Sequence, residues 1–240
     1  MVANPLSLDM KKIVVLTGAG MSAESGLKTF RDSDGLWENH NVYDVATPEA
    51  WARDPELVLN FYNDRRNQVI KANPNKAHLA LAELEINFHV TIITQNIDNL
   101  HERGGSTRVL HLHGEIDLAR SSVEASLIYP LNGAEIKMGD TCEKGSQLRP
   151  NIIWFGEPVP MIEEAIPIVE MADIVLVIGT SLAVYPAAGL VNYAPHFAEK
   201  YYINPQGLDG MNIHDFNVIE KKAGDGVPAL VNHLMEEVRN

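Results

Sequence analysis

The strongest chemical signal in the chain is a glycine-rich loop directly after its first apolar run. That run, IVVLT at 13–17, leads into GAGMSAESG at 18–26. Gly18, Gly20 and Ala23 satisfy the G-x-G-x-x-A form of the dinucleotide fingerprint, in which glycines let backbone N–H groups approach a pyrophosphate at a helix N-terminus. An ordinary glycine-rich turn between a strand and a helix is the alternative interpretation.

The next stretch argues against a hydride-transferring dehydrogenase. Such enzymes carry a second strand and an acidic ribose ligand about 20 residues after the glycines. Here the corresponding residues, TFRDSDGLWENHNVYD at 29–44, are typical of loop and helix.

Other polar groups follow other apolar runs. They are Gln95-Asn96-Ile97-Asp98 after 89–94, His113-Gly114 at the end of 108–113, Gly179-Thr180-Ser181 at the end of 173–179, and Asn204-Pro205-Gln206 at the end of 200–204. Each alone fits ordinary turn chemistry. With the glycine loop, however, five such groups would meet at the carboxyl edge of a parallel sheet, where open α/β sheets bind ligands.

His113 is the candidate general base. Strand alternation puts His111 and His113 on one face, so a metal-binding pair or a structural histidine are alternatives. The position of His113 at a strand end, with Asn96 and Asp98 at another, favours proton abstraction from a sugar hydroxyl near neutral pH.

The apolar runs predict a doubly wound parallel sheet of the α/β class, because helical stretches such as 56–72 and 75–85 alternate with them. Thr47-Pro48-Glu49 predicts a helix start. Two excursions interrupt the pattern: 27–75 is mostly helical, and 115–148 is polar and rich in turns.

Composition restricts the partners. The chain has 32 acidic and 19 basic residues and a formal charge of −13, which disfavours direct contact with nucleic acid or an anionic membrane. No apolar run reaches the roughly 20 residues of a membrane span, and the first dozen residues lack the apolar stretch of a secretory signal. A single cysteine, Cys142, fits a reducing compartment. We therefore expect a cytoplasmic protein, and a monomer.

The motifs together resemble the sirtuins, the NAD-dependent protein-lysine deacylases, in their bacterial form. The blocks that carry the resemblance are GAGMSAESGLKTFRDSDGLW (18–37), QNID (95–98), HG (113–114), RPNIIWFGE (149–157), GTS (179–181) and NP (204–205). They occur in the family's order and spacing over nearly the whole chain. The resemblance implies a Rossmann-like NAD domain (1–26, 76–114 and 149–240) and a small module built from the insertions 27–75 and 115–148, with NAD and acyl-lysine meeting between them.

The resemblance also implies residue roles. Around NAD they fall to Gly18, Ala19, Gly20, Ala23 and Glu24 in the phosphate loop, Phe30 and Arg31 as a shield over the ribose, Gln95, Asn96, Ile97 and Asp98 at the nicotinamide ribose, and Gly179, Thr180, Ser181, Asn204, Pro205, Gln206 and Ala223 at the adenosine end. Asn96, Asp98 and the base His113 would be catalytic. Ile153 and Phe155 would line the acyl-lysine tunnel, and the backbone of Gly156 and Glu157 would pair with the substrate peptide.

The reaction implied is group transfer from acyl-lysine to NAD, giving free lysine, nicotinamide and O-acyl-ADP-ribose. An ADP-ribosyltransferase or NAD glycohydrolase, and a non-enzymatic NAD or ADP-ribose sensor, are the alternatives. A serine hydrolase built on Gly179-Thr180-Ser181-Leu182-Ala183 lacks the final glycine of the G-x-S-x-G elbow.

One helix stripe bears on the acyl group. Val58, Tyr62, Arg65 and Val69 share a face at helical spacing, and an arginine there needs a partner. An internal carboxylate would serve. The Tyr-x-x-Arg pattern, however, resembles the sirtuin subgroup that accepts succinyl- and malonyl-lysine, so we predict desuccinylase and demalonylase activity beside deacetylase activity.

The expected departure from the family is the metal. Many sirtuins carry two cysteine pairs between the HG and RP blocks, which bind a structural zinc. This stretch has Ser121, Ser122 and a single thiol, Cys142. We therefore expect no metal site, and a small module held by Leu127, Ile128, Tyr129, Leu131 and Ile136.

Overall fold

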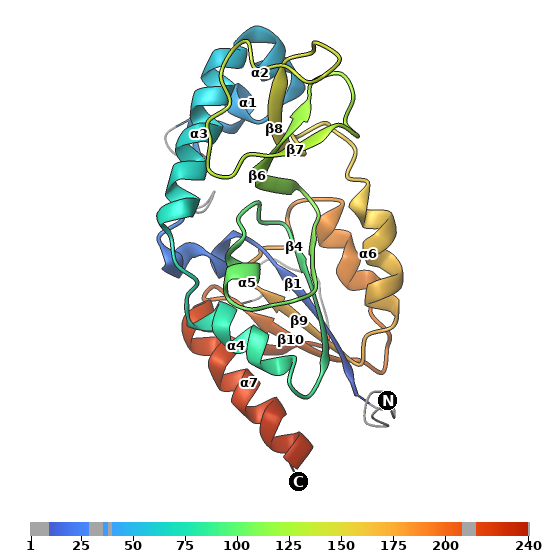
Figure 1. Ribbon diagram of the computed structural model, residues 1–240. Helices are drawn as coiled ribbons and strands as arrows, with labels where there is room; N and C mark the ends of the chain where they lie inside the picture. Colours follow the sequence, from blue (N-terminus) through green and yellow to red (C-terminus); the bar gives the residue numbers. More distant parts are fainter. Residues whose placement is uncertain (1–9, 29–35, 38–39, 208–214, 240) are drawn as a thin grey trace, which may run out of the picture.

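A six-stranded parallel sheet forms the larger part of the molecule (Figure 1). The computed structural model describes residues 10–28, 36–37, 40–207 and 215–239. The strands are β1 (Lys12–Thr17), β4 (His89–Thr94), β5 (Val109–His111), β9 (Ile174–Ile178), β10 (Glu199–Ile203) and β11 (Asn217–Ile219). Their order is β11-β10-β9-β1-β4-β5, so the chain reverses its direction of growth beside β1. This switch point is where open α/β sheets form their ligand crevice.

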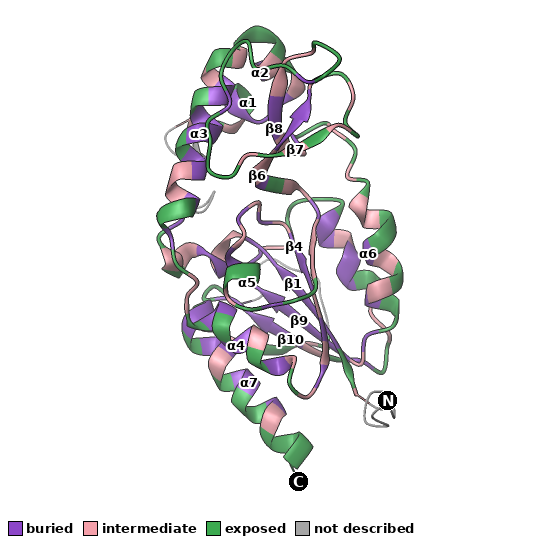
Figure 2. Ribbon diagram, in the orientation of Figure 1, coloured by how far each residue is buried: buried purple, intermediate pink, exposed green. Residues whose placement is uncertain are grey.

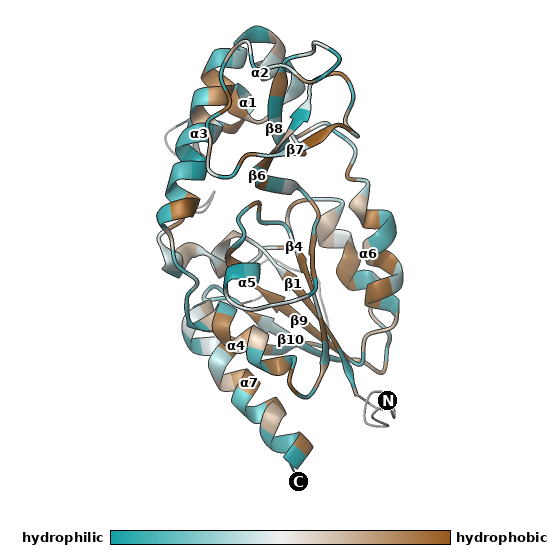
Figure 3. Ribbon diagram, in the orientation of Figure 1, coloured by the Kyte–Doolittle hydropathy of each residue, from teal (hydrophilic) through white to brown (hydrophobic). Residues whose placement is uncertain are grey.

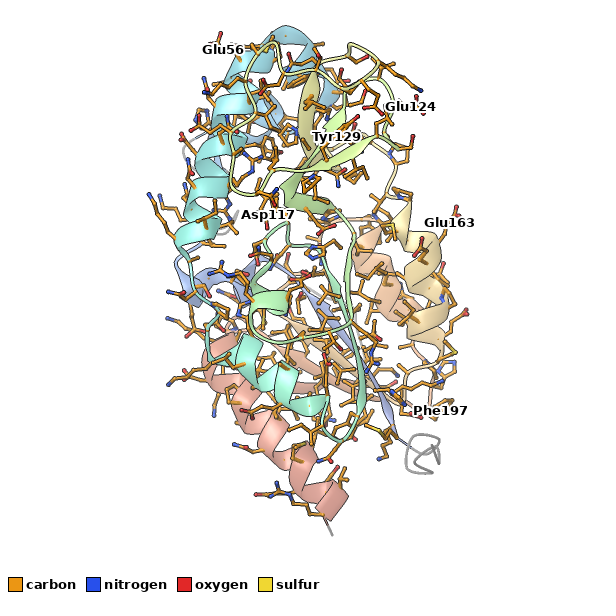
Figure 4. The ribbon with its side chains drawn as sticks, in the orientation of Figure 1. Glu56, Asp117, Glu124, Tyr129, Glu163 and Phe197 are labelled. Atoms are coloured by element: carbon orange, nitrogen blue, oxygen red, sulfur yellow. The ribbon has the colours of Figure 1, made fainter. Side chains whose placement is uncertain are left out.

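Helices cover both faces of this sheet. On one face α4 (Lys76–Leu84) and α7 (Ala223–Arg239) pack on Ile13 and Val15. On the other face α6 (Met161–Glu170) and the 3₁₀ helix η4 (Ala187–Tyr193) pack on Val14 and Leu16. The central strands β1 and β9 are therefore buried and apolar along nearly their whole length, as Figures 2 and 3 show. The predicted doubly wound sheet is confirmed.

The smaller part lies beyond the carboxyl edge of the sheet (Figure 1). It contains α1 (Val42–Val45), α2 (Pro48–Arg53), α3 (Pro55–Lys71) and an antiparallel sheet of order β7-β6-β8, made of β6 (Gly114–Ser121), β7 (Ile128–Pro130) and β8 (Leu148–Ile152). A two-residue pair, β2 (Leu36–Trp37) and β3 (His40–Asn41), precedes α1. The Thr47 hydroxyl accepts from the N–H of Ala50 at 3.0 Å, which confirms the predicted helix start.

The domain boundaries stay a prediction, with one difference. The second insertion was expected to end at residue 148, but β8 continues the small sheet to Ile152, with Pro150 opposite Ala119. The helix predicted at 56–72 is confirmed, since α3 spans Pro55–Lys71.

The core of the small sheet differs from the expected one. Ile136 is buried and Leu131 packs beside it, but Ile128 is 47% exposed, so its assignment to the core was wrong. Ile128 lies on β7, a three-residue edge strand that has a partner on one side only. The core of the small sheet is completed instead by α3, whose Leu59 packs in the same buried cluster as Ile136.

Two polar side chains of α3 also hold this part together. Asn63 forms two hydrogen bonds with the backbone of Ile136, donating to its carbonyl at 2.9 Å and accepting from its N–H at 3.0 Å. The buried Arg66 donates to the carbonyl of Ile116 at 2.8 Å and to Asn63 Oδ1 at 2.7 Å. One turn of helix thus satisfies backbone groups of two distant segments.

Among the described residues, no helix is both long and apolar enough to cross a membrane.

We expect Asn63→Ala to destabilise the protein by about 1–3 kcal/mol, because two buried backbone groups of Ile136 lose their partners. Chemical denaturation measures this change. Asn60→Ala is the matched control, since Asn60 is exposed on the same helix. Equal stability of the two variants would contradict this role of Asn63.

Candidate active site

A cleft of about 740 Å³ lies between the carboxyl edge of the main sheet and the smaller part. It is lined by all the predicted site residues that the structure describes, namely Gly18, Ala19, Gly20, Ala23, Glu24, Tyr62, Arg65, Gln95, Asn96, Ile97, Asp98, His113, Ile153, Phe155, Gly156, Glu157, Gly179, Thr180, Ser181, Asn204, Pro205, Gln206 and Ala223. Phe30 and Arg31 lie outside the described residues. The five strand-end groups therefore do meet at one edge.

The glycine loop packs directly on the loop after β9. The N–H of Gly20 donates to the carbonyl of Gly179 at 2.8 Å. A Cβ on Gly18 would lie 2.7 Å from Thr180 Cβ, and one on Gly179, whose φ is +60°, would lie 2.4 Å from Met21 N. Only glycine fits at these positions, so the two loops form a continuous backbone floor.

The described residues 19–28, after the first glycine of the loop, contain no α-helix. The chain instead forms two 3₁₀ helices, η2 (Ala19–Met21) and η3 (Ala23–Ser25), which end where Gly26 takes a φ of +88°. The loop is anchored from behind by two longer helices. Asn75, the N-cap of α4, donates to the carbonyl of Met21 at 2.8 Å, and Glu24 accepts from the N–H of Gly224 in α7 at 2.7 Å.

The loop after β4 adds a buried polar network. Asn96 Nδ2 donates to the carbonyl of Gly18 and to Ser22 Oγ, both at 3.1 Å. Ser22 Oγ donates to Asp98 Oδ2 at 3.0 Å, and Asp98 Oδ1 accepts from the N–H of Leu100. Burial raises the pKa of Asp98, while these hydrogen bonds act in the opposite direction. Ser22 was missed, although its place inside the fingerprint loop could have indicated it.

The ring of His113 is fixed by a contact with the backbone. Its Nδ1 lies 3.1 Å from the carbonyl oxygen of Gln95, which can only accept, so the proton sits on Nδ1 and Nε2 keeps its lone pair. Burial lowers the pKa of His113, whereas the hydrogen bond to Gln95 raises it less. The ring is therefore neutral near pH 7 and lines the cleft.

Tyr62 and Arg65 contribute to the cleft wall from α3. The hydroxyl of Tyr62, fully buried, accepts from Trp154 Nε1 at 3.1 Å. Burial raises its pKa, so it stays protonated. Arg65, 7% exposed, donates to Gln68 Oε1 at 3.2 Å and to the carbonyl of Lys28 at 3.3 Å.

A second cluster fixes the segment after β8. Both oxygens of Glu157 accept from Arg120 and Arg149, and Glu157 Oε2 also accepts from the N–H of Trp154 at 2.7 Å. The Arg149 guanidinium stacks 3.2 Å from the centre of the Trp154 ring. The N–H of Glu157 donates to the carbonyl of Trp154, so this N–H is already paired within the chain. Trp154, which was not among the predicted site residues, thus contacts both Tyr62 and Arg149.

The part of the chain that the structure describes holds no cluster of three or more histidine, cysteine, aspartate or glutamate side chains able to bind a metal ion.

The residues fit a dinucleotide. The floor of the cleft is bare backbone at Gly18, Gly20 and Gly179, because side chains are sterically excluded there. Polar groups of Asn96, Asp98 and Asn204 lie along this floor, and the volume is within the usual range for cofactor sites. A glycine floor at the switch point of a doubly wound sheet defines the class of dinucleotide-binding α/β proteins.

Comparison with known proteins identifies the family. Residues 18–186 match the Sir2 family. The chain is 54% identical over 231 residues, 94% of this chain and 99% of the relative, to an NAD-dependent protein deacylase of Bacteroides thetaiotaomicron. Among solved structures, a variant of a Sir2 homologue in complex with ADP-ribose matches with a TM-score of 0.88 at 40% identity, over 96% of this chain and 94% of that one. A Sir2 homologue in complex with NAD matches with a TM-score of 0.85 at 40% identity, over 96% and 91%.

The chain therefore belongs to the Sir2 family, the sirtuins. It is an NAD-dependent protein deacylase, and NAD is its cofactor.

If His113 is the general base, as the sequence predicts, His113→Ala should lower kcat/KM for deacylation by about 10²–10⁴-fold. In the unsubstituted enzyme the acid limb of the kcat/KM profile should have its midpoint below 6.5, since the pKa of His113 is lowered and only the neutral ring accepts a proton.

Steady-state kinetics between pH 5 and 9 measure both effects. His196→Ala is the control, because His196 is exposed and lies outside the cleft. An acid limb above 6.5, or full activity without the His113 imidazole, would exclude its role as base.

Proposed function

We propose that this enzyme removes succinyl and malonyl groups, as well as acetyl groups, from lysine side chains, giving nicotinamide and O-acyl-ADP-ribose. The observation that carries the acyl specificity is the buried pair of Tyr62 and Arg65 in the cleft wall. The pair stands one helical turn apart on α3, so both side chains face the same space.

Charge supports this choice. Burial is the main cause of the raised pKa at both Tyr62 and Asp98, and the positive charge of Arg65 acts against it at both. The guanidinium therefore makes the part of the cleft around it favourable for an anion. A planar guanidinium binds a carboxylate through two parallel hydrogen bonds. The Tyr62 hydroxyl, which accepts from Trp154, would add a third hydrogen bond.

Another part of the cleft wall is apolar. Val69 and Ile152 line the cleft with Phe155, which is 42% exposed at its mouth. Such a wall suits the alkyl chain of lysine, with the acyl carbonyl toward the nucleotide end. Beside Phe155, Gly156 has a φ of +90°, and this backbone would pair with the substrate peptide as an added strand.

At the nucleotide end, bound NAD supplies a ribose whose bond to nicotinamide is broken and whose anomeric carbon receives the acyl oxygen. Asn96 and Asp98, fixed through Ser22, would hold this ribose. His113 Nε2 would accept a proton from a ribose hydroxyl. Thr180 and Asn204 would hold the adenosine end; Asn204 Nδ2 donates to the carbonyl of Thr180 at 3.1 Å, which joins the two loops.

The expected partners are acyl-lysine segments of proteins or peptides, and the expected compartment is the cytoplasm. The formal charge of −13 supports substrate segments that carry basic residues.

We also propose that the small sheet folds without structural zinc. Its thiols are limited to Cys142, and Asn63 and Arg66 supply the cross-links described above. Elemental analysis of the purified protein should find substoichiometric zinc, and a chelator should leave the melting temperature unchanged. One tightly bound zinc per chain would contradict this proposal.

For the acyl specificity, we expect Arg65→Met to lower kcat/KM for succinyl- and malonyl-lysine peptides by about 10–100-fold, the cost of losing a charge-assisted hydrogen bond. Turnover of the acetyl-lysine peptide should change about 3-fold or less, because an acetyl group has no distal carboxylate.

The comparison is made on one peptide sequence carrying each acyl group, with NAD present or omitted. Arg53→Met is the matched control, since Arg53 is exposed on α2 and pairs with Asp44. An unchanged ratio of succinyl to acetyl turnover in the Arg65 variant would refute the assignment. Mass spectrometry of the ADP-ribose product distinguishes deacylation from glycohydrolysis.

A further inference from the structure

Four successive backbone carbonyls of the loop after β4, from Thr94 to Ile97, each contact a group of the 111–116 segment. The carbonyl of Thr94 accepts from the N–H of Leu112 at 2.9 Å, and that of Ile97 accepts from the N–H of Ile116 at 2.8 Å. Between these two backbone contacts, the carbonyls of Gln95 and Asn96 are bound by histidine side chains of the 111–116 segment instead.

The two histidines use the same ring atom in this contact. His113 Nδ1 lies 3.1 Å from the Gln95 oxygen, and His111 Nδ1 lies 3.0 Å from the Asn96 oxygen. Both rings therefore lie on the side of the 111–116 segment that faces the loop. They differ at the other nitrogen: His113 lines the cleft, whereas His111 Nε2 lies 2.8 Å from Glu102 Oε1 of α5 (Leu100–Arg103).

This geometry defines the protonation of His111. Its ring stands between a carbonyl oxygen and a carboxylate, and both groups can only accept hydrogen bonds. A neutral imidazole has one N–H, so it can satisfy one of them while directing a lone pair at the other. Only the imidazolium donates to both. The side chain is 7% exposed, which leaves little room for water to take either place.

We propose that His111, held by Glu102, is a positioning residue that fixes the Asn96 carbonyl and thereby the side chains of Asn96 and Asp98 at the nicotinamide ribose. This inference rests on the function proposed above for those two residues. The connection is short: the carbonyl that His111 binds belongs to Asn96 itself, whose amide group donates to Gly18 and Ser22.

The charged surroundings agree with an imidazolium. Burial lowers the pKa of His111, but the hydrogen bond and charge of Glu102, the Asn96 carbonyl and the charge of Glu115 raise it above its ordinary value. The other titratable groups that it influences are Asp98, whose pKa its charge lowers against the effect of burial, and His101. His101 stays neutral, because burial and the charges of His78 and His111 lower its pKa.

The sign of the pH effect follows. A group whose pKa is raised on folding stabilises the folded state fully below its unfolded pKa, and this contribution is lost as the pH rises through the folded pKa. The hold on the Asn96 carbonyl should therefore weaken on the alkaline side of 6.5. This limb is opposite to the acid limb of His113, so the two histidines are separable in one pH profile.

The test uses Glu102→Gln in the full-length protein. A glutamine has no charge to keep His111 protonated, so we expect the alkaline limb of kcat/KM for NAD to move to lower pH. At pH 8 we expect KM for NAD to rise about 3–10-fold, as for one lost hydrogen bond. KM for the acyl peptide should stay unchanged, with the same result for acetyl and succinyl peptides, because the effect arises at the nucleotide end.

Glu115→Gln is the matched control, since it removes a nearby charge without removing a hydrogen bond to His111. It should shift the limb less. Because a merely structural defect would also raise KM, ¹⁵N NMR of the histidine rings adds a direct readout. His111 should titrate above 6.5 in the unsubstituted protein and lower in Glu102→Gln.

Two results would overturn the proposal: a His111 ring that is neutral at pH 6.5, or a Glu102→Gln enzyme with unchanged KM for NAD and unchanged alkaline limb. Asn96→Ala separates it from the function on which it rests. If this variant binds NAD as well as the unsubstituted protein in calorimetry, the ribose role of Asn96 is wrong, and the positioning role of His111 fails with it. If Asn96→Ala weakens NAD binding and Glu102→Gln does not, only the role of His111 is wrong.

Discussion

The whole site depends on a backbone contact between the loops that follow β1 and β9. The N–H of Gly20 donates to the carbonyl of Gly179, and no Cβ fits at Gly18, Gly20 or Gly179. This contact occurs at the switch point of the sheet, where the chain leaves β1 toward β4 on one side and returns through β9 on the other. Parallel pairing alone would leave an open gap here; the close approach of two glycine-containing loops closes it and makes a floor. In the part of the chain that the structure describes, the polar groups that we assign to NAD line the same cleft as this floor.

Buried polar side chains around this floor hold the neighbouring loops in place. The side chains of Ser22 and Asn96 link the loop after β1 to the loop after β4. Glu157 accepts hydrogen bonds from two arginines and from the Trp154 N–H in the segment after β8. Each of these groups is hydrogen-bonded because an unsatisfied polar atom in such surroundings is costly. The hydrogen bond to the Gln95 carbonyl likewise gives His113 a defined tautomer. Burial, not a nearby charge, is the main cause of its lowered pKa.

Local sequence patterns predicted the sheet and the positions of the site residues, because strand ends, glycines and helix caps are encoded over a few residues. β4 spans the expected residues 89–94, and Thr47 caps α2 as expected. Contacts between distant segments were not predictable in this way. Ile128 was assigned to a core that its edge strand does not enter, and the pairing of Asn63 with Ile136 joins residues 73 positions apart. Likewise, the ring of His111 was expected on the face of His113, but its carboxylate partner on α5 follows only from the fold. Tyr62 and Arg65 could be paired from local spacing alone, because they share one helix.

The way in which Asn75 and Glu24 grip the rear of the glycine loop has a mechanical consequence. Each joins the loop to the first turn of a helix, α4 or α7, and these two helices pack against each other across one sheet face. The loop is thus clamped from behind by the same pair that covers the sheet, although α7 is the final helix of the chain. Loosening α7 would therefore also loosen the glycine loop that we assign to the NAD phosphates. Residues far from any reacting atom thus influence the shape of that loop.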